Sequence, residues 1–370
     1  MSDLHQILPL WRELSSSGQD YVLATVVQVD GSGYRKPGAR MIVTADGQHV
    51  GTISGGCLEA EVARKAFWYT QSGPVLRQYS THPDDGDVPY GMGCGGIIHV
   101  FLERSVTANA VMEQIAHRFN SREPLAIATI LDGDNTSQRA FWPDDTIEQD
   151  WNTGVANLAY ESFLNRHTFC TNIENEGQTV RVFVEWLPAR TGLFVFGAGD
   201  DAIPLVKFAC QMGWFITVLD GRAHLATRVR FPEAHEVYAP TPDILSSLTT
   251  RPGDTAALLT HSLEQDTCAL SFALDQNLAY IGVLGPRRRT EQILATLAAE
   301  RSGSASIEDR VAFWMHRLHA PMGLDLGGNT PADIALAAIA EIQQCLSHTT
   351  GKSLSELRSN AQAARMEASA

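Results

Sequence analysis

Two cysteines, each beside glycines, are the residues of this chain best suited to chemistry. Cys57 follows Gly55 and Gly56 at the start of a helical pattern, and Cys94 precedes Gly95 in the stretch GMGCGG. The partial positive charge of a helix N-terminus lowers the pKa of a thiol, and glycines let a bulky group approach the backbone. One such cysteine is usually a small buried apolar residue. Two in one domain favour sulfur chemistry or a site that faces a metal.

A basic loop lies ahead of the first cysteine. Residues 31–40 read GSGYRKPGAR and place Arg35, Lys36 and Arg40 among glycines and a proline. The loop is either a grip for an anion or a solvent-exposed turn.

The cysteines give no sign of a disulfide framework or of zinc. The chain has six cysteines without a CxxC motif or a regular spacing, and no further Cys or His stands at ligand spacing from Cys57 or Cys94. We therefore expect free thiols and no metal site built from these residues.

A second candidate site follows an apolar strand in the C-terminal half. The stretch VFGAGDDA is a G-x-G-x-x-A fingerprint between a strand and a helix, which is the context of dinucleotide binding. Gly197 permits the tight turn and Gly199 the close approach of a ligand. Asp220 ends the next strand, where a ribose hydroxyl would bind, and the nearby Arg222 leaves open a 2′-phosphate instead.

Two carboxylates complicate this nucleotide site. Asp200 and Asp201 begin the following helix, where they are expected to cap it and stabilise it by about 1 kcal/mol. The same charges repel a pyrophosphate at the helix N-terminus. The loop therefore predicts either NAD(P) binding or a Rossmann-like domain with an empty or repurposed loop. His261 and the arginines of residues 285–289 end later strands and are further candidates for contacting a phosphate.

Length and charge limit the classes of protein that fit. The 370 residues suffice for two or three domains, and 44% of them are hydrophobic, as in globular proteins. The net charge of −14 argues against nucleic acid and anionic membranes as partners, because both need a basic face. No apolar stretch approaches the roughly 20 residues of a membrane span, and the N-terminus lacks the features of a signal peptide. We expect a cytoplasmic protein.

The N-terminal half has the pattern of a mixed α+β domain. Its apolar spacing predicts helices and strands that would position the two thiols: helices at residues 3–16 and 58–71, and strands at 21–29, 39–45, 49–54 and 96–103. The pair Asp46-Gly47 predicts a hairpin between the second and third strands.

Residues 121–186 echo this first half. PLAIATILDGD resembles YVLATVVQVDG, and VRVFVEW resembles IHVFLER. The echo indicates either a degenerate internal repeat that lacks the glycine-cysteine loops or ordinary strand composition.

The C-terminal half alternates short apolar strands with helical stretches, which is typical of a doubly wound parallel sheet. The strands are expected at residues 193–199, 215–220, 236–240, 255–261 and 279–285. The predicted fold class is α/β, with a mixed α+β domain over residues 1–188, a Rossmann-like domain over 189–350 and a tail over 351–370.

Over most of its length the chain resembles the XdhC/CoxI family of xanthine dehydrogenase accessory factors. ATVVQVDGSGYRKPGARM, GTISGGCLEAEV and GMGCGG are similar to the N-terminal domain of that family. FGAGDDAIPLVKFA, GWFITVLDGR, TRVRFPEA, YIGVLGPRRRTEQIL and APMGLDLGGNTPADIALAAIAEI are similar to its Rossmann-like domain. The chain departs from the family at Asp200, where many members carry a histidine.

The resemblance implies a cytoplasmic maturation factor rather than a catalyst. Such a factor binds molybdenum cofactor of the molybdopterin type, plain or nucleotide-extended, protects it during sulfuration and delivers it to an apo molybdenum hydroxylase. By this implication Cys57 and Cys94 lie near the molybdenum or handle sulfur. The predicted cofactor-binding residues are Tyr34, Arg35, Arg40, Gly55, Gly56, Gly95, Gly197, Gly199, Asp220 and Arg222.

The expected partners are the hydroxylase, a cysteine desulfurase and a second copy of the chain. The dimer is expected because four aromatic residues read as exposed: Trp11, Trp68, Trp142 and Trp151.

Two other functions stay open. The glycine loop and Asp220 favour an NAD(P)-dependent oxidoreductase, although this leaves the thiol loops unexplained. The third alternative is a scaffold that binds no small ligand and whose glycine loops only shape a protein interface.

Overall fold

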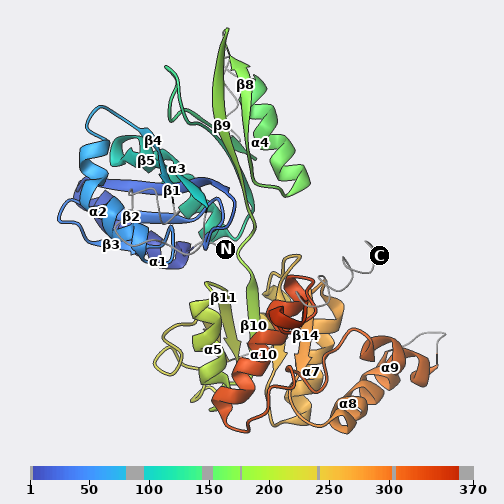
Figure 1. The fold of residues 1–370 in the computed structure, drawn as a ribbon. Coiled ribbons are helices and arrows are strands. Elements are labelled where there is room, and N and C mark those ends of the chain that lie inside the picture. Colours follow the sequence, from blue (N-terminus) through green and yellow to red (C-terminus); the bar gives the residue numbers. More distant parts are fainter. Residues whose placement is uncertain are drawn as a thin grey trace. The chain divides into compact units, whose positions relative to one another are not determined.

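A computed structural model describes residues 3–80, 96–143, 153–175, 177–239, 242–301 and 306–357. The chain divides into two compact units, Met1–Arg190 and Thr191–Ala370, which are drawn in Figure 1. The first unit carries the thiol motifs and the second the dinucleotide-type loop.

The first half of the first unit forms a five-stranded antiparallel sheet, sheet A. Its elements are α1 (Leu4–Ser17), β1 (Tyr21–Asp30), β2 (Arg40–Thr44), β3 (His49–Gly51), α2 (Cys57–Tyr69), β4 (Val75–Ser80) and β5 (Ile97–Arg104), with the strand order β3-β2-β1-β5-β4. The predicted hairpin at Asp46-Gly47 is confirmed, because β2 pairs with β3 and Gly47 has a φ of +85°.

The second half forms a four-stranded antiparallel sheet, sheet B. Its elements are α3 (Ser105–Ser121), β6 (Leu125–Ile130), β7 (Arg139–Trp142), α4 (Thr153–Asn165), β8 (Phe169–Asn175) and β9 (Gln178–Leu187), with the order β7-β6-β9-β8. Except for β3, each strand of sheet A has a counterpart in sheet B. The strands that echo each other in sequence, β1 with β6 and β5 with β9, are the central pairs of the two sheets.

The register shows that the internal repeat is real. Thr25 pairs with Phe101 and with Arg40 in sheet A, and Thr129 pairs with Phe183 and with Arg139 in sheet B. Leu23 lies opposite Glu103, and Ile127 lies opposite Glu185, at matching places. Ordinary strand composition does not explain the same residue types at the same register positions in two sheets.

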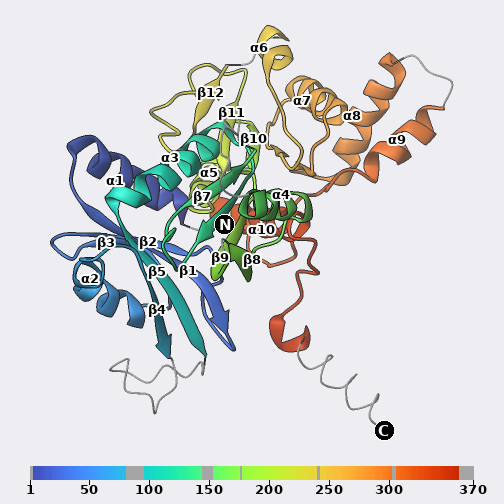
Figure 2. The ribbon, with the colours of Figure 1, turned by 90° about the horizontal axis from the view of Figure 1, so that it is seen from above.

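Each outer face of the pair of sheets is covered by one helix. Helix α2 packs on sheet A through Leu58 and Val62, and α4 packs on sheet B through Val155 and Ala159. Helices α1 and α3 share a third core with residues of both sheets. Figure 2 shows α2 and α4 beside their own sheets.

Two crossed ion pairs join the halves. Arg40 of sheet A binds Glu185 of sheet B, with 2.8 Å between Nη1 and Oε1 and a second contact between Nη2 and Oε2. Arg139 of sheet B binds Glu103 of sheet A through its Nη2. All four side chains are nearly inaccessible to solvent. Arg40 and Arg139 occupy equivalent positions, so the pairing is reciprocal.

The second unit is a parallel five-stranded sheet, sheet C, wrapped by helices. Its elements are β10 (Gly192–Phe196), α5 (Ala202–Gln211), β11 (Phe215–Leu219), β12 (Glu236–Tyr238), α6 (Pro242–Ser247), β13 (Thr255–Leu258), α7 (Leu263–Asp275), β14 (Tyr280–Val283), α8 (Arg287–Glu300), α9 (Ile307–Met315) and α10 (Pro331–Leu346). The order is β12-β11-β10-β13-β14, with every pairing parallel. The predicted fold class is confirmed.

The helices lie on both faces of sheet C. Helices α5 and α10 share one hydrophobic core with the sheet, and α7 and α8 share another on the opposite face. All residues of β10 are buried, as a central parallel strand requires. The chain leaves β10 in one direction and returns at β13 on the other side, so the crevice beyond these two strand ends is where such sheets bind ligands.

The expectation that four tryptophans are exposed holds only in part. Trp11 is buried in the core between α1 and α3, where its Nε1 donates to Asn109, so it does not mark an interface. Trp68 is exposed, Trp142 is half-buried and Trp151 lies outside the described residues. In the described ranges, every helix is too short or too polar to cross a bilayer.

Candidate functional site

The loop before α2 is held by one buried carboxylate. Glu59 accepts the backbone N–H groups of Ile53 at 3.0 Å, Ser54 at 2.7 Å and Gly56 at 2.9 Å, as well as the Ser54 hydroxyl at 2.5 Å. Burial favours the neutral acid, but these hydrogen bonds outweigh it and hold the pKa of Glu59 below its ordinary value. The loop is therefore fixed from its own helix.

Sequence reasoning missed Glu59, although a signal was present. The N-terminal residue of α2 is preceded by Gly56, and Glu59 stands three residues after that glycine, which is the spacing of a capping box. Gly56 has a φ of +112°, a conformation that favours glycine. A side chain at this position would be strained, so the glycine is required by the backbone.

The predicted thiols are only partly located by the structure. Cys57 is the first residue of α2, as expected from the sequence. Its side chain, together with Cys94 and Gly95, lies outside the described residues. The four cysteines whose side chains are described, Cys170, Cys210, Cys268 and Cys345, are free thiols.

The basic loop packs against a glycine beside each of the two cysteine motifs. A Cβ atom on Gly55 would lie 3.8 Å from Cγ of Tyr34, and a Cβ atom on Gly96 would lie 2.3 Å from the carbonyl oxygen of Ser32. Gly55 stands two residues before Cys57 and Gly96 two residues after Cys94, and both pack on the segment 32–34. Three stretches that are far apart in sequence converge at one place.

The cations of this loop have different surroundings. Arg35 pairs with Asp3 at 2.9 Å. Arg40 is buried and bound to Glu185, which gives it a structural role between the two sheets. Lys36 is exposed and has no ion-pair or hydrogen-bond partner for its ammonium group in the described ranges. Of the three, Lys36 offers an uncompensated positive charge.

Gly38 is needed for the ion pair beneath the loop. It has a φ of +92°, and a Cβ atom there would lie 2.5 Å from Oε1 of Glu185. Any side chain would collide with the carboxylate that binds Arg40. Gly38, Arg40 and Glu185 therefore form a single packed unit.

The glycine loop of the second unit has the predicted backbone. Gly197 has a φ of +122°, and a Cβ atom there would lie 2.9 Å from the carbonyl carbon of Leu259. A Cβ atom on Gly199 would meet nothing within 4 Å, so this position stays open to a ligand. Ala202 is buried between α5 and the sheet.

Asp220 is already saturated with hydrogen bonds. Its carboxylate accepts the Ala198 N–H at 2.7 Å, and Arg222 donates from its backbone N at 2.8 Å, from Nε at 2.9 Å and from Nη2 at 2.6 Å. Burial alone would raise the pKa of Asp220, but these bonds lower it. Arg222 occupies the place where a ribose diol would bind Asp220 in a dinucleotide enzyme.

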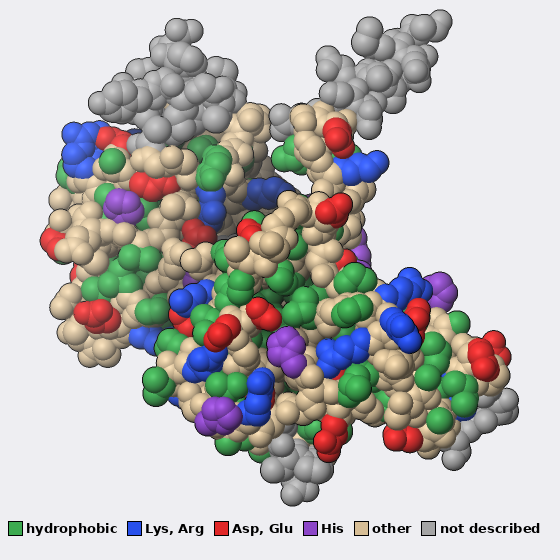
Figure 3. Space-filling view, turned by 90° about the horizontal axis from the view of Figure 1, so that it is seen from below, with side chains coloured by type: hydrophobic (Ala, Val, Ile, Leu, Met, Phe, Trp, Pro, Cys, Tyr) green, Lys and Arg blue, Asp and Glu red, His purple; other side chains and the backbone are tan. Residues whose placement is uncertain are grey.

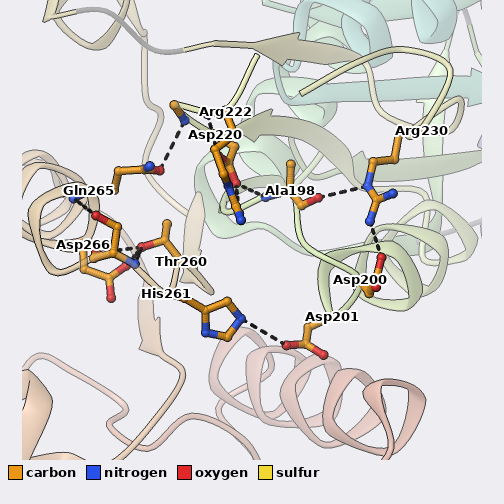
Figure 4. A network of polar contacts seen from close by, with 12 residues as sticks. Ala198, Asp200, Asp201, Asp220, Arg222, Arg230, Thr260, His261, Gln265 and Asp266 are labelled. Carbon is orange, nitrogen blue, oxygen red and sulfur yellow. Dashed lines mark hydrogen bonds and ion pairs between the residues drawn. The ribbon is translucent and has the colours of Figure 1, made fainter. Parts of the chain in front are cut away.

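The other carboxylates at this crevice are also paired, as Figure 4 shows. Asp200 pairs with Arg230, whose Nε donates to the Ala198 carbonyl at 3.0 Å. Asp201 lies 3.9 Å from Nε2 of His261. Asp266 pairs with Arg289 at 2.8 Å and accepts from the Thr260 hydroxyl.

The expectation that Asp200 and Asp201 cap the helix is wrong. Asp201 is the N-cap residue of α5 but makes no side-chain capping hydrogen bond. Asp201 has helical backbone angles, φ −66° and ψ −27°, instead of the extended ones typical of a capping residue, and Asp200 pairs with Arg230. Their negative charges nevertheless remain at the place where a pyrophosphate would bind.

The surface carries no broad field of one charge on the face drawn in Figure 3. Lys and Arg side chains are interspersed there with Asp and Glu side chains. Together with the net charge of −14, this arrangement does not suit a nucleic-acid surface.

Comparison with known proteins gives matches over both units. Residues 14–80 match the model of the XdhC and CoxI family, and residues 193–342 match the model of the XdhC Rossmann domain. A protein of Bacillus subtilis (strain 168), named as a probable component of xanthine dehydrogenase, is 31% identical over 360 residues, which cover 93% of this chain and 98% of that protein. The molybdenum cofactor insertion chaperone PaoD of Escherichia coli (strain K12) is 31% identical over 137 residues, 34% of this chain and 40% of that protein.

A solved structure has the same fold. It is the crystal structure of a xanthine dehydrogenase from Bacillus halodurans, with 28% sequence identity and a TM-score of 0.73, and the match covers 96% of this chain and 98% of that chain.

Proposed function

This chain belongs to the XdhC and CoxI family, and from that premise we propose that it binds molybdenum cofactor and delivers it to an apo molybdenum enzyme of the xanthine dehydrogenase type. The names of two relatives, a molybdenum cofactor insertion chaperone and a probable xanthine dehydrogenase component, support a role in the maturation of such enzymes. The protection of the cofactor while its terminal sulfur is installed is part of the proposal.

One observation carries the proposal: the basic loop and the flanks of both thiol motifs pack together at residues 32–34. The cargo is a phosphorylated pterin with a dithiolene that holds molybdenum. A carrier for it needs soft or glycine-lined surroundings at the metal end and cations at the anionic end. Gly55 and Gly56 supply an accessible backbone, Cys57 and Cys94 the soft atoms, and Lys36 a positive charge.

The residues present fit this cargo. A Cβ atom on Gly56 would meet nothing within 4 Å, and Tyr34 beside Gly55 is 75% exposed. A bulky group can therefore approach the start of α2. The carboxylate of Glu59 does not oppose an anion there strongly, because it is buried and surrounded by four donors.

The partners in the proposal are the apo hydroxylase, a cysteine desulfurase as sulfur donor and a second copy of this chain. The names of the relatives support a molybdenum enzyme as the first of these partners. The other two are predictions, as are a cytoplasmic location and the choice between plain and nucleotide-extended cofactor.

Cofactor analysis of protein purified from cells that make molybdopterin tests the proposal. We expect near-stoichiometric cofactor, and we expect the double variant Cys57→Ala, Cys94→Ala to lose most of it and to fail to activate the apo hydroxylase. The matched control is Cys268→Ala, which removes an exposed free thiol on α7. Full activation by the double variant would refute the role of the two thiols.

The alternative, an NAD(P)-dependent oxidoreductase, has less support. Arg222 saturates Asp220, and the carboxylates of Asp200 and Asp201 stand at the helix N-terminus. A dinucleotide would have to displace Arg222 from Asp220, and its pyrophosphate would lie beside the carboxylates of Asp200 and Asp201.

A further inference from the structure

We infer that a cavity in the first unit binds a flat heterocycle with a negatively charged substituent, held by Lys36 and by the aromatic rings that line the cavity. This inference rests on the proposed function, because such a heterocycle is the pterin end of the cargo. It assigns that end to a site separate from the thiols.

The cavity has the size of a small-ligand site. Its volume is about 490 Å³, within the roughly 300–1,000 Å³ typical of ligand pockets. It is bounded by the loop at residues 34–39, by the C-terminal end of α3 and by the end of β9. Both halves of the internal repeat therefore contribute to its wall.

Aromatic side chains from three different elements line the cavity. Tyr34 comes from the basic loop, Phe119 from α3 and Trp186 from β9. The guanidinium of Arg190 covers the Phe119 ring at 4.3 Å, which fixes the position of that ring. Aromatic rings in a cavity wall favour a flat conjugated ligand, because such a ligand can stack or pack edge-on against them.

The charges of the cavity favour an anion. Arg35 pairs with Asp3 at 2.9 Å. Arg118 pairs with Glu123 at 2.6 Å and also donates to the carbonyl of Pro143.

Glu185, the other carboxylate in the wall, is bound to Arg40. Lys36 is the cation left without a partner for its ammonium group in the described ranges. In a chain of net charge −14, a single uncompensated cation among aromatic rings is the group that an anionic substituent would contact.

Tyr34 connects this cavity to the thiol site. It lines the cavity, and a Cβ atom on Gly55 would lie 3.8 Å from its Cγ. A ligand whose ring lies in the cavity can therefore extend past Tyr34 toward the start of α2. This is the arrangement that a cargo with one heterocyclic end and one metal end requires.

The test uses pterin-6-carboxylate as the probe and cofactor-free full-length protein, with isothermal titration calorimetry as the readout. Unsubstituted pterin is the neutral counterpart. We expect the carboxylate to bind at least about tenfold more tightly than pterin, and Lys36→Gln to remove this preference, since a hydrogen bond to a charged group is worth about that factor. Lys207→Gln, an exposed lysine on α5, is the matched control and should change nothing.

A second variant tests the rings without endangering the fold. Tyr34 is 75% exposed, so Tyr34→Ala should fold normally and weaken probe binding about fivefold. Equal binding of the two probes, or a Lys36→Gln protein that still prefers the carboxylate, overturns the assignment.

The two proposals can fail separately. Protein that is loaded with cofactor in cells but does not bind pterin-6-carboxylate when cofactor-free would refute this inference and leave the proposed function in place. Protein that is never loaded and activates no hydroxylase would refute the function whatever the probe does.

Discussion

Glu59 shows how one side chain can position a site that it does not itself form. Its carboxylate binds three backbone N–H groups and one hydroxyl of the loop that leads into Cys57. A neutral amide of the same shape cannot accept all four, because its NH₂ group faces donors. The position of the thiol motif therefore depends on the charge of Glu59.

We predict that Glu59→Gln destabilises the protein by about 2 kcal/mol, since buried donors lose their acceptor, and that it lowers cofactor retention. Urea unfolding followed by circular dichroism measures the first effect and cofactor analysis the second. Glu264→Gln, at an exposed glutamate of α7, is the control. Unchanged stability and retention in Glu59→Gln would show that the loop is held by other contacts.

Acid should destabilise the protein through carboxylates whose pKa is lowered by folding. Hydrogen bonds lower the pKa of Glu59, Asp220 and Glu341 against the effect of burial. The unfolded chain then binds more protons at intermediate pH, so stability is fully present above the unfolded pKa of about 4 and is lost as pH falls through the lower folded values. Asp266 acts in the opposite direction, because burial raises its pKa.

Urea midpoints measured between pH 7 and pH 3 check this expectation. We expect a monotonic fall below about pH 5, with a smaller slope in Glu59→Gln, which lacks one of the titrating groups. A midpoint that rises on acidification would mean that groups such as Asp266 dominate.

At the level of elements, the reciprocal ion pairs are the strongest evidence that the first unit is a duplicated motif. Arg40 and Arg139 lie at equivalent register positions and bind Glu185 and Glu103, which are also equivalent. Each half thus supplies a cation to the other half and receives one in return. This arrangement ties the two sheets together through β2 and β5 of sheet A and β7 and β9 of sheet B.

Removing one partner should cost far more than removing both. We predict that Glu185→Gln destabilises the protein by about 3–5 kcal/mol, because it leaves Arg40 buried and unpaired, whereas Arg40→Met with Glu185→Leu costs much less. A double-mutant cycle in urea measures the coupling energy. The exposed pair Arg287 and Glu291 on α8 is the control and should give under about 1 kcal/mol. Additive effects at Arg40 and Glu185 would contradict the account.

The elements differ in how well the sequence predicts them. The strands of sheet C are short apolar runs with helical stretches between them, which is the pattern of a parallel sheet covered by helices on both faces, and four of them, β10, β11, β13 and β14, are buried along nearly their whole length. The edge strands β7 and β8 are not predicted individually, since β7 is only half-buried along its length and has no clear alternation.

The candidate site is predictable only in part. The helix start at Cys57 and the tight turn at Gly197 follow from local spacing. The cavity wall cannot be predicted in this way. It brings residues 34–39 together with Arg118, Phe119 and Trp186, and a local sequence pattern does not predict contacts between residues so far apart in the chain.

At the scale of the whole molecule, the two units differ in whether the charged side chains of their candidate sites already have partners. In the part of the chain that the structure describes, Lys36 at the cavity of the first unit has no partner for its ammonium group, whereas the carboxylates at the crevice of the second unit are paired with basic side chains (Figure 4). The fold alone does not make the second unit a dinucleotide enzyme, because function depends on the groups at the site.

Calorimetry with NAD(H) and NADP(H) tests this difference. We predict no heat of binding at millimolar ligand for the full chain, since Arg222 saturates Asp220 and two carboxylates stand where the pyrophosphate would lie. The double variant Asp200→Asn, Asp201→Asn should bind the dinucleotide more tightly than the unmodified protein, because it removes two negative charges that repel the pyrophosphate. Micromolar binding to the unmodified protein would restore the oxidoreductase alternative.

The two ion pairs that join the halves of the first unit bear on how many cofactor molecules one chain would bind. Two identical halves joined as a homodimer would present the same pocket twice, whereas their fusion into one polypeptide allows one half to carry the glycine-cysteine stretches and the other to do without them. Under the proposed function, we therefore expect one cofactor molecule per chain, with residues of the half that lacks those stretches forming part of the cavity wall.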